Sequence, residues 1–346
     1  MKPAIRFFSI TFFFSYLSFF PFSKPGVPEI ELLSSGTSTN IRGLSVVNDN
    51  VVWVSGSNGI VGKTFNAGKT WKWITVKGFE KNDFRDIEAF DAATAIIMSV
   101  SEPAYILKTN DGGDTWKIVF ENKTKGMFLD AMEFWNERSG IVIGDPVDGR
   151  FFIARSFDGG TSWQEIPFDH RPSADSGEAC FAASGTNIRA LDRDEAVFVS
   201  GGSRSRIFSK KGAVTLPIIQ GKQTTGANSL AIWDNFKLNG GKKMITVGGD
   251  FTADTSTHNN CFISNDGGST WKAPIAAPHG YRSCVEYFSK SEIFCCGLNG
   301  ADYSKNGGMN WKWISKESFN VCRASKSGSS VYFAGTNGKV GKIVWK

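Results

Sequence analysis

Thr109-Asn-Asp-Gly-Gly-Asp-Thr-Trp116 recurs with small changes at four other places in this chain of 346 residues. The other copies are Thr64-Phe-Asn-Ala-Gly-Lys-Thr-Trp71, Ser156-Phe-Asp-Gly-Gly-Thr-Ser-Trp163, Ser264-Asn-Asp-Gly-Gly-Ser-Thr-Trp271 and Ser304-Lys-Asn-Gly-Gly-Met-Asn-Trp311. Their Trp residues follow one another at intervals of 45, 47, 108 and 40 residues. A period of roughly 40–50 residues is typical of propeller blades. The interval of 108 predicts two periods with one degenerate copy between them.

Apolar runs of strand length precede the octapeptides and end in small residues. Examples are Val51-Val-Trp-Val-Ser-Gly56, Ala196-Val-Phe-Val-Ser-Gly201, Met244-Ile-Thr-Val-Gly248 and Val331-Tyr-Phe-Ala-Gly335. Such runs, separated by Gly, Asn and Asp turns, indicate antiparallel hairpins, and about four strands per repeat is typical of a propeller. The runs centre near residues 53, 97, 142, 198, 246, 294 and 333. The sequence therefore predicts an all-β fold, a seven-bladed β-propeller of four-stranded antiparallel blades.

We expect one closed domain over residues 24–346. This architecture accounts for much of the 38 Gly and 11 Trp in the composition. The degenerate fourth repeat, Arg206-Ile-Phe-Ser-Lys-Lys-Gly212, has no Trp. Because the chain ends at the last predicted strand, residues 29–33 or their neighbours are expected to complete the last blade.

The octapeptide has a structural role in this interpretation. Its Gly pair supplies positive φ in the turn between the third and fourth strands, and its Asp side chain bonds backbone N–H groups across that turn. Its Trp buries a large ring at the start of the outer strand. The structural set is Asn66, Asp111, Asp158, Asp266 and Asn306 with Trp71, Trp116, Trp163, Trp271 and Trp311. We therefore do not count these acids as catalytic.

The octapeptide resembles the Asp-box, or BNR, repeat of sialidases, sortilin-type receptors and bacterial propellers. Longer segments resemble exported bacterial propellers related to the photosystem II assembly factor Ycf48. These segments are Gly144-Asp-Pro146, Gly177-Glu-Ala-Cys-Phe-Ala-Ala-Ser-Gly185, Val247-Gly-Gly-Asp-Phe251 and Gly280-Tyr-Arg-Ser283. The resemblance implies a seven-bladed scaffold of WD40- or YVTN-like repeats that binds a membrane-protein precursor. Many non-photosynthetic relatives are labelled oxidoreductases, yet this chain has no G-x-G-x-x-G, haem or flavin motif, so we expect no cofactor.

The N-terminus predicts export. Lys2 and Arg6 precede an uncharged run over residues 7–20, which has the length of a signal-peptide core and is shorter than the roughly 20 residues of a membrane span. We expect a signal peptide over residues 1–23 and a periplasmic or extracellular protein. An uncleaved N-terminal anchor is the alternative.

Charge and arginine spacing suggest the kind of partner. The net charge of +6 without a Lys/Arg run does not favour nucleic acid. Arginines recur near the start of the predicted innermost strands, at Arg42, Arg85, Arg189, Arg282 and Arg323. They predict a positive ring at the channel mouth that binds an acidic protein or peptide, with the protein itself a monomer. The alternative is that each Arg pairs with a local acid such as Asp86 or Glu178.

A binding site is expected on the face opposite the Asp-box turns. By this interpretation the insertions 145–150, 170–178, 250–258 and 278–282 lie there. Asp145, Glu178, Asp250 and Tyr281 in these insertions are candidate catalytic residues of a sialidase-like glycoside hydrolase, the competing hypothesis. Loop capping by Asp145 and Asp250 is the simpler explanation. The three His have no metal-binding spacing, so we expect no metal.

Six cysteines, an even number, permit disulfides in an exported protein. Cys284 and Cys322 are the best candidate pair, because they occupy similar inner-strand positions in neighbouring blades. Buried free thiols are the equally supported alternative.

Overall fold

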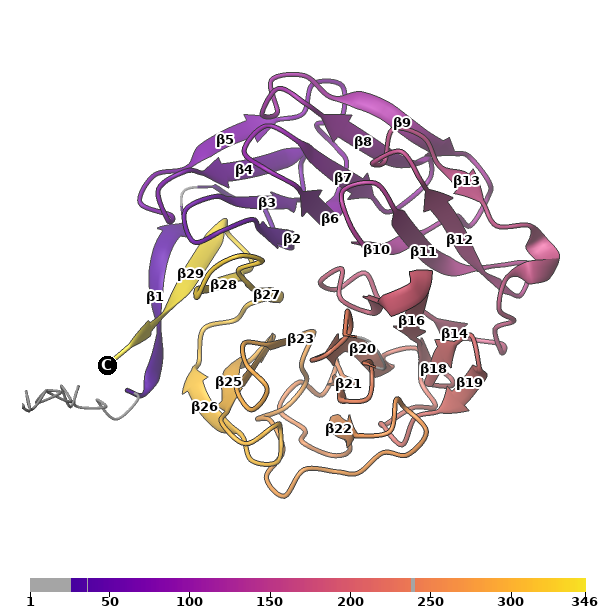
Figure 1. Ribbon diagram of the computed structural model, residues 1–346, viewed down its shortest axis with the longest axis vertical. Coiled ribbons are helices and arrows are strands. Elements are labelled where there is room, and N and C mark those ends of the chain that lie inside the picture. Colours follow the sequence, from indigo (N-terminus) through magenta and orange to yellow (C-terminus); the bar gives the residue numbers. More distant parts are fainter. Residues whose placement is uncertain (1–25, 36, 238–239) are drawn as a thin grey trace, which may run out of the picture.

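Seven antiparallel sheets stand around a central channel in the computed structural model, which describes residues 26–35, 37–237 and 240–346 (Figure 1). Blade 1 comprises β2 (Ile41–Val46), β3 (Val52–Gly56), β4 (Ile60–Thr64) and β5 (Lys72–Thr75). Blade 2 comprises β6 (Phe84–Ala89), β7 (Ala95–Ser99), β8 (Ala104–Thr109) and β9 (Lys117–Asn122). Blade 3 comprises β10 (Leu129–Phe134), β11 (Gly140–Val147), β12 (Arg150–Ser156) and β13 (Gln164–Glu165). Blade 4 comprises β15 (Ile188–Leu191), β16 (Glu195–Val199), β18 (Arg206–Ser209) and β19 (Gly212–Thr215). Blade 6 comprises β23 (Cys284–Tyr287), β24 (Ile293–Gly297), β25 (Gly300–Ser304) and β26 (Lys312–Ser315).

Blade 5 departs from the four-stranded pattern. Its sheet runs in the order β14 (Glu178–Ala179), β17 (Gly201–Gly202), β20 (Thr225–Ile232), β21 (Met244–Asp250) and β22 (Cys261–Ser264). The place of its outer strand is taken by a single bridge between Ile263 and Lys272. The only helical elements in the described part of the chain are two short 3-10 turns, η1 (Phe168–His170) and η2 (Asp192–Asp194). The predicted all-β propeller with seven blades is confirmed.

The two ends of the domain close the ring in blade 7. Its strands are β27 (Val321–Ala324), β28 (Val331–Ala334), β29 (Lys339–Trp345) and, at the outer edge, β1 (Pro28–Ser35). Strand β1 pairs antiparallel with β29 from Pro28 opposite Trp345 to Ser35 opposite Lys339 (Figure 1). Residues 29–33 therefore complete the last blade, as the sequence predicts.

The octapeptide turns make the local hydrogen bonds that their residue types suggest. In blade 5 the Asp266 carboxylate accepts the Thr270 N–H at 2.9 Å, and the Ser264 hydroxyl accepts the Gly268 N–H at 2.9 Å. Hydrogen bonds from Thr270 and Ser264 lower the pKa of Asp266 to about 2. Gly268 has φ +85°, so the turn requires glycine there. In blade 4 the same position is a tight turn at Lys210 and Lys211, which needs no Asp-box.

Apolar side chains pack between neighbouring blades. Trp163 lies in the core shared by blades 2 and 3, with its ring centroid 5.9 Å from that of Phe134. All six cysteines are buried free thiols, and the Sγ atoms of Cys284 and Cys322 are 3.8 Å apart. The predicted pair is therefore adjacent but not bonded.

Residues 1–23, the predicted signal peptide, lie outside the described residues. No helix within the described ranges has the length and apolar character needed to cross a membrane.

Candidate functional site

The chain between β14 and β15 crosses the channel. Residues 180–187, here called the plug, lie in the middle of the ring, and all but Phe181 are buried (Figure 1). The plug contacts blades 1, 3, 5, 6 and 7 through polar atoms. The hydrogen bonds are Arg42 Nη1 to Ala183 O at 3.2 Å, Cys180 N to Asp145 Oδ1 at 2.8 Å, Leu230 N to Thr186 O at 2.9 Å, Ser184 Oγ to Ser283 O at 2.8 Å and Arg323 Nη2 to Gly185 O at 3.2 Å.

Small residues let the plug fit so closely. Gly185 has φ +64°, and a Cβ at this position would overlap the Asp86 carboxylate of blade 2. Asp86 cannot move aside, because its two carboxylate oxygens accept the Ile87 N–H at 2.8 Å and the Met132 N–H at 2.7 Å. Burial raises the pKa of Asp86 to about 7, against the opposing effect of Arg323. The plug therefore closes one end of the channel with a tightly fitted backbone.

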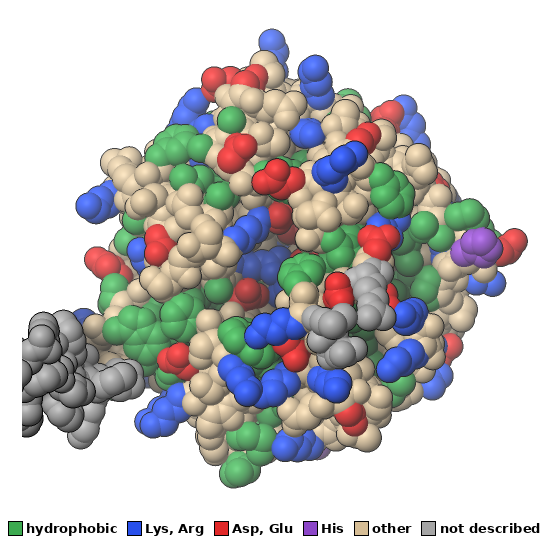
Figure 2. Space-filling view, in the orientation of Figure 1, with side chains coloured by type: hydrophobic (Ala, Val, Ile, Leu, Met, Phe, Trp, Pro, Cys, Tyr) green, Lys and Arg blue, Asp and Glu red, His purple; other side chains and the backbone are tan. Residues whose placement is uncertain are grey.

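The other end of the channel remains open as a blind cavity of about 760 Å³. Its lining comes from the ends of the inner strands and from the turns that join the first and second strands of every blade except blade 4, which contributes only Arg189. The Asp-box turns pack on those same turns, through hydrogen bonds such as Gly159 N to Arg138 O at 2.8 Å and Gly267 N to Lys242 O at 3.1 Å. This cavity thus opens on the Asp-box face, whereas the sequence suggested a site on the opposite face. Figure 2 shows this mouth as a central hollow with charged side chains inside it.

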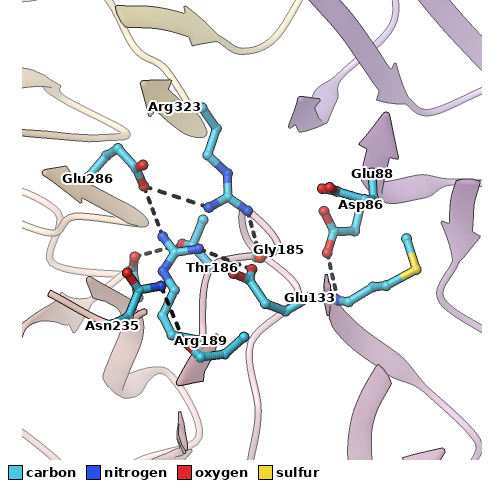
Figure 3. Close-up of polar contacts among 12 residues, drawn as sticks. Asp86, Glu88, Glu133, Gly185, Thr186, Arg189, Asn235, Glu286 and Arg323 are labelled. Atoms are coloured by element: carbon cyan, nitrogen blue, oxygen red, sulfur yellow. Dashed lines mark hydrogen bonds and ion pairs between the residues drawn. The ribbon is translucent and has the colours of Figure 1, made fainter. Parts of the chain in front are cut away.

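Two arginines and two glutamates form the floor of the cavity (Figure 3). Arg189 of β15 lies between Glu133 of β10 and Glu286 of β23, with N–O distances of 3.5 and 3.0 Å. Arg323 of β27 approaches the same Glu286 oxygen at 3.7 Å. Burial raises the pKa of Glu286 and outweighs the two arginines. The floor is an alternating ion-pair cluster that links blades 3, 4, 6 and 7.

Aromatic side chains surround this charged floor. Trp135, Trp233 and Phe288 line the cavity, and Phe236 lies at its rim with 53% of its surface exposed. The Lys326 ammonium, also in the lining, pairs with Glu88. Apolar walls with a few fixed polar groups are the usual composition of a ligand site, and the volume lies in the usual range of roughly 300–1,000 Å³.

The structure does not gather the five predicted arginines at one mouth. Arg189 and Arg323 line the cavity, whereas Arg42 and Arg85 do not. Arg42 bonds the plug, and Arg85 pairs with Asp83 at 2.8 Å. Arg282 is fully buried and pairs with Asp302, so it contributes to the core of blade 6. Four of the five arginines instead pair with nearby acids, as the alternative hypothesis predicts. They are Arg85, Arg189, Arg282 and Arg323.

Two of the four candidate hydrolase residues border a second, shallower depression of about 560 Å³ near the plug. The Glu178 carboxylate there is buried in a two-pronged pair with Arg206 and also accepts the Asp175 N–H at 2.9 Å. Asp145 accepts the Cys180 N–H of the plug. Both carboxyl groups therefore already hold parts of the chain together.

The other two candidates also have structural partners. Asp250 caps its own turn, because its Oδ1 accepts the Thr252 N–H at 3.0 Å and the Thr252 hydroxyl at 2.6 Å. The buried Tyr281 hydroxyl donates to Asn228 Oδ1 at 2.8 Å, and burial raises the pKa of this phenol. This arrangement does not favour the glycoside hydrolase hypothesis.

Sequence reasoning missed Glu133, Glu286 and the plug. A signal was present, because β10 and β23 carry acids within short apolar inner strands, at Asp130, Glu133 and Glu286. The plug is a run of mostly small residues that directly follows the predicted insertion 170–178. Neither pattern identifies its spatial partner without the fold.

Neither a protein-family model nor a curated protein sequence matches the chain. Solved structures do match. YCF48 bound to a D1 peptide has a TM-score of 0.63 and 15% identity, over 95% of this chain and 100% of that chain. The chain has the Ycf48 propeller fold. YCF48 from Cyanidioschyzon merolae has a TM-score of 0.62 and 15% identity, over 91% and 98% of the two chains. The WD40 propeller domain of Doa1 has a TM-score of 0.62 and 10% identity, over 93% and 98%. At these identities the likeness extends to the fold alone.

Proposed function

We propose that this protein is an exported scaffold that binds a protein or peptide partner, and that the central cavity receives part of that partner. The observation that carries the proposal is the blind cavity with aromatic walls and an ion-paired floor. A propeller of the same fold, YCF48, is known bound to a D1 peptide, which supports this class of ligand.

The plug limits how a partner enters. Because it closes the far end, a chain cannot run through the ring, so the partner inserts a chain end or the tip of a loop. Half-exposed Phe236 at the rim offers an apolar anchor, and the floor offers both donors and acceptors. Anchors of this kind, buried next to fixed polar groups, dominate the affinity of many interfaces.

Export rests on the N-terminal sequence, where Lys2 and Arg6 precede the uncharged run. Sequencing the N-terminus of protein from the native host tests this part. A mature start near residue 24 supports export, and an intact Met1 argues against it.

The cavity is tested by blocking it. Ala324 lies in the cavity lining and Ala174 in the shallow depression on the other face, and both are partly buried. Peptides selected from a random display library on the native protein are measured against Ala324→Trp and Ala174→Trp by fluorescence anisotropy. We expect Ala324→Trp to weaken binding at least about tenfold, because the indole fills space that the peptide needs.

Ala174→Trp is the matched control and should change affinity less than about twofold. Thermal unfolding of both variants confirms that each is folded. Binding in the central cavity would be refuted if the two substitutions weakened binding equally. It would also be refuted if Ala174→Trp weakened binding and Ala324→Trp did not.

A further inference from the structure

Five lysines are carried by turns of one sector of the cavity face. Lys211 is in the β18–β19 turn of blade 4, and Lys237, Lys242 and Lys243 are in the β20–β21 connection of blade 5. Lys290 is in the β23–β24 turn of blade 6. Figure 2 shows Lys and Arg side chains gathered on the lower part of this face, beside the hollow. We call these five residues the lysine sector.

The lysine sector is not neutralised by the surrounding acids. None of its five ammonium groups lies within ion-pair distance of a carboxylate in the part of the chain that the structure describes. Three of the neighbouring acids have other partners, whereas Asp234 in the β20–β21 connection has a buried Oδ1 with no hydrogen-bond partner among the described residues. Asp194 pairs with Arg155 at 2.7 Å, Glu195 pairs with Lys210, and Glu292 accepts the Tyr303 hydroxyl at 2.7 Å.

The opposite sector of the same face has the opposite charge. The corresponding first-to-second strand turns of blades 1, 2 and 3 carry Asp49, Asp91 and Glu137, the last of them next to the exposed Arg138. Glu137 is exposed at the cavity lining and forms no ion pair with a described residue. The unpaired lysines and these acids thus lie on different sides of the mouth, and this uneven distribution of charge steers a charged ligand to one side of it.

We infer that the lysine sector docks an acidic segment of the partner, adjacent to the end or loop tip that enters the cavity. The inference rests on the proposed function and adds the chemistry and direction of the bound chain. An acidic segment gains attraction from five ammonium groups that pair with no carboxylate among the described residues, of which Lys237 lies over the Trp233 ring, and avoids Asp49, Asp91 and Glu137 on the other side. A basic segment would meet repulsion where the exposed cations are most numerous.

A polypeptide fits this surface better than a nucleic acid. The lysines of the sector are divided among separate turns of three blades, so they do not form the continuous basic strip that a phosphate backbone requires. A polypeptide can place its few carboxylates opposite the lysines and present neutral groups elsewhere. The sector also borders a cavity of peptide-sized volume.

The experiment compares two charge reversals with the same change in net charge. Lys211→Glu, Lys242→Glu and Lys290→Glu place one reversal in each turn of the sector. Lys77→Glu, Lys81→Glu and Lys125→Glu form the control, because these exposed lysines lie in connections between blades on the plugged face. Probes are a fluorescein-labelled peptide of alternating Glu and Ser, its Gln isostere, a short DNA duplex and anionic lipid vesicles.

At about 50 mM salt we expect the Glu peptide to bind the native protein at least about tenfold more tightly than the Gln isostere. The sector triple should remove this preference and the control triple should change it less than about twofold. Equal losses in both triples would mean a response to net charge and would overturn the inference. Tighter binding of the duplex or vesicles than of the peptide, with the same dependence on the sector, would also overturn it.

The test of the lysine sector can fail independently of the test of the proposed function. If Ala324→Trp abolishes binding of selected peptides while the sector triple leaves it unchanged, the scaffold function stands and the docking of an acidic segment is wrong. If neither variant affects binding, both proposals fail.

Discussion

The two ends of the central channel begin from the same inner strands but are completed differently. At the plugged end, carboxyl groups lie among backbone and small side chains. Asp130 is fully buried there, and neither of its carboxylate oxygens has a hydrogen-bond partner among the described residues. At the open end, Glu133 and Glu286 lie beside Arg189 and Arg323 with access to the cavity.

Acidic residues therefore have a structural role at the plugged end, whereas at the open end they are accessible to a ligand. Burial raises the pKa values of Asp130 and Asp145, and the neighbouring Asp145 carboxylate raises the pKa of Asp130 further because like charges repel. At the open end Arg189 and Arg323 lie beside Glu286 and partly offset the rise in its pKa that burial causes. A channel of uniform strands thus has one end that is filled by the plug and one end that opens into a cavity with an ion-paired floor.

The largest expected effect tests how tightly the plug fits. Gly185→Ala forces a Cβ into the fixed Asp86 carboxylate at a positive φ, and we expect a loss of roughly 3 kcal/mol in the free energy of unfolding. Gly149→Ala is the control, because Gly149 has φ +79° but nothing within 4 Å of the added atom. It should lose only about 1 kcal/mol. Equal losses in urea unfolding would show that the plug yields easily.

An effect of intermediate size on the free energy of unfolding is expected for the ion-pair cluster at the floor of the open end. Arg189→Met leaves Glu133 and Glu286 without their closest cation, and we expect a loss of roughly 2 kcal/mol, reduced by hydration from the cavity. Lys326→Ala removes a more exposed pair with Glu88 and should cost less than about 0.5 kcal/mol. Chemical denaturation at neutral pH measures both. A stabilised Arg189→Met protein would mean that the cluster is maintained for binding at the expense of stability.

The smallest effect is a pH dependence at the plugged end. The folded-state pKa values of Asp130 and Asp145 are raised, so these groups hold protons that the unfolded chain releases above about pH 4. The free energy of unfolding should therefore fall as the pH rises from about 4 to 7. Asp145→Asn keeps an acceptor for the Cys180 N–H and should remove on the order of 1 kcal/mol of this fall.

The control for that pH profile is Asp175→Asn. Asp175 lies in the same depression, but its hydrogen bond from Arg204 lowers its pKa. Its replacement should leave the fall between pH 4 and 7 in place. Identical profiles of the native protein and Asp145→Asn would argue against the buried carboxyl pair.

Local and periodic features of the fold are predictable because they repeat. Each octapeptide encodes its own turn through the hydroxyl, carboxylate and Gly positions, as at Ser264, Asp266 and Gly268. Seven apolar runs then indicate seven blades, and strand closure by residues 29–33 follows from where the last run ends. Blade 5 is the exception, because β14 and β17 come from irregular segments with no strand-length apolar pattern.

The site resists prediction because its residues are brought together only by ring closure. Glu133, Arg189, Glu286 and Arg323 are separated by tens of residues and belong to four blades, so no local spacing relates them. Turn chemistry and apolar periodicity act over a few residues, and from them the sequence specifies the strands, the number of blades and the Asp-box turns. Which arginines meet which acids, and which end of the channel residues 180–187 close, depends on packing among all seven blades, so only the tertiary structure determines it.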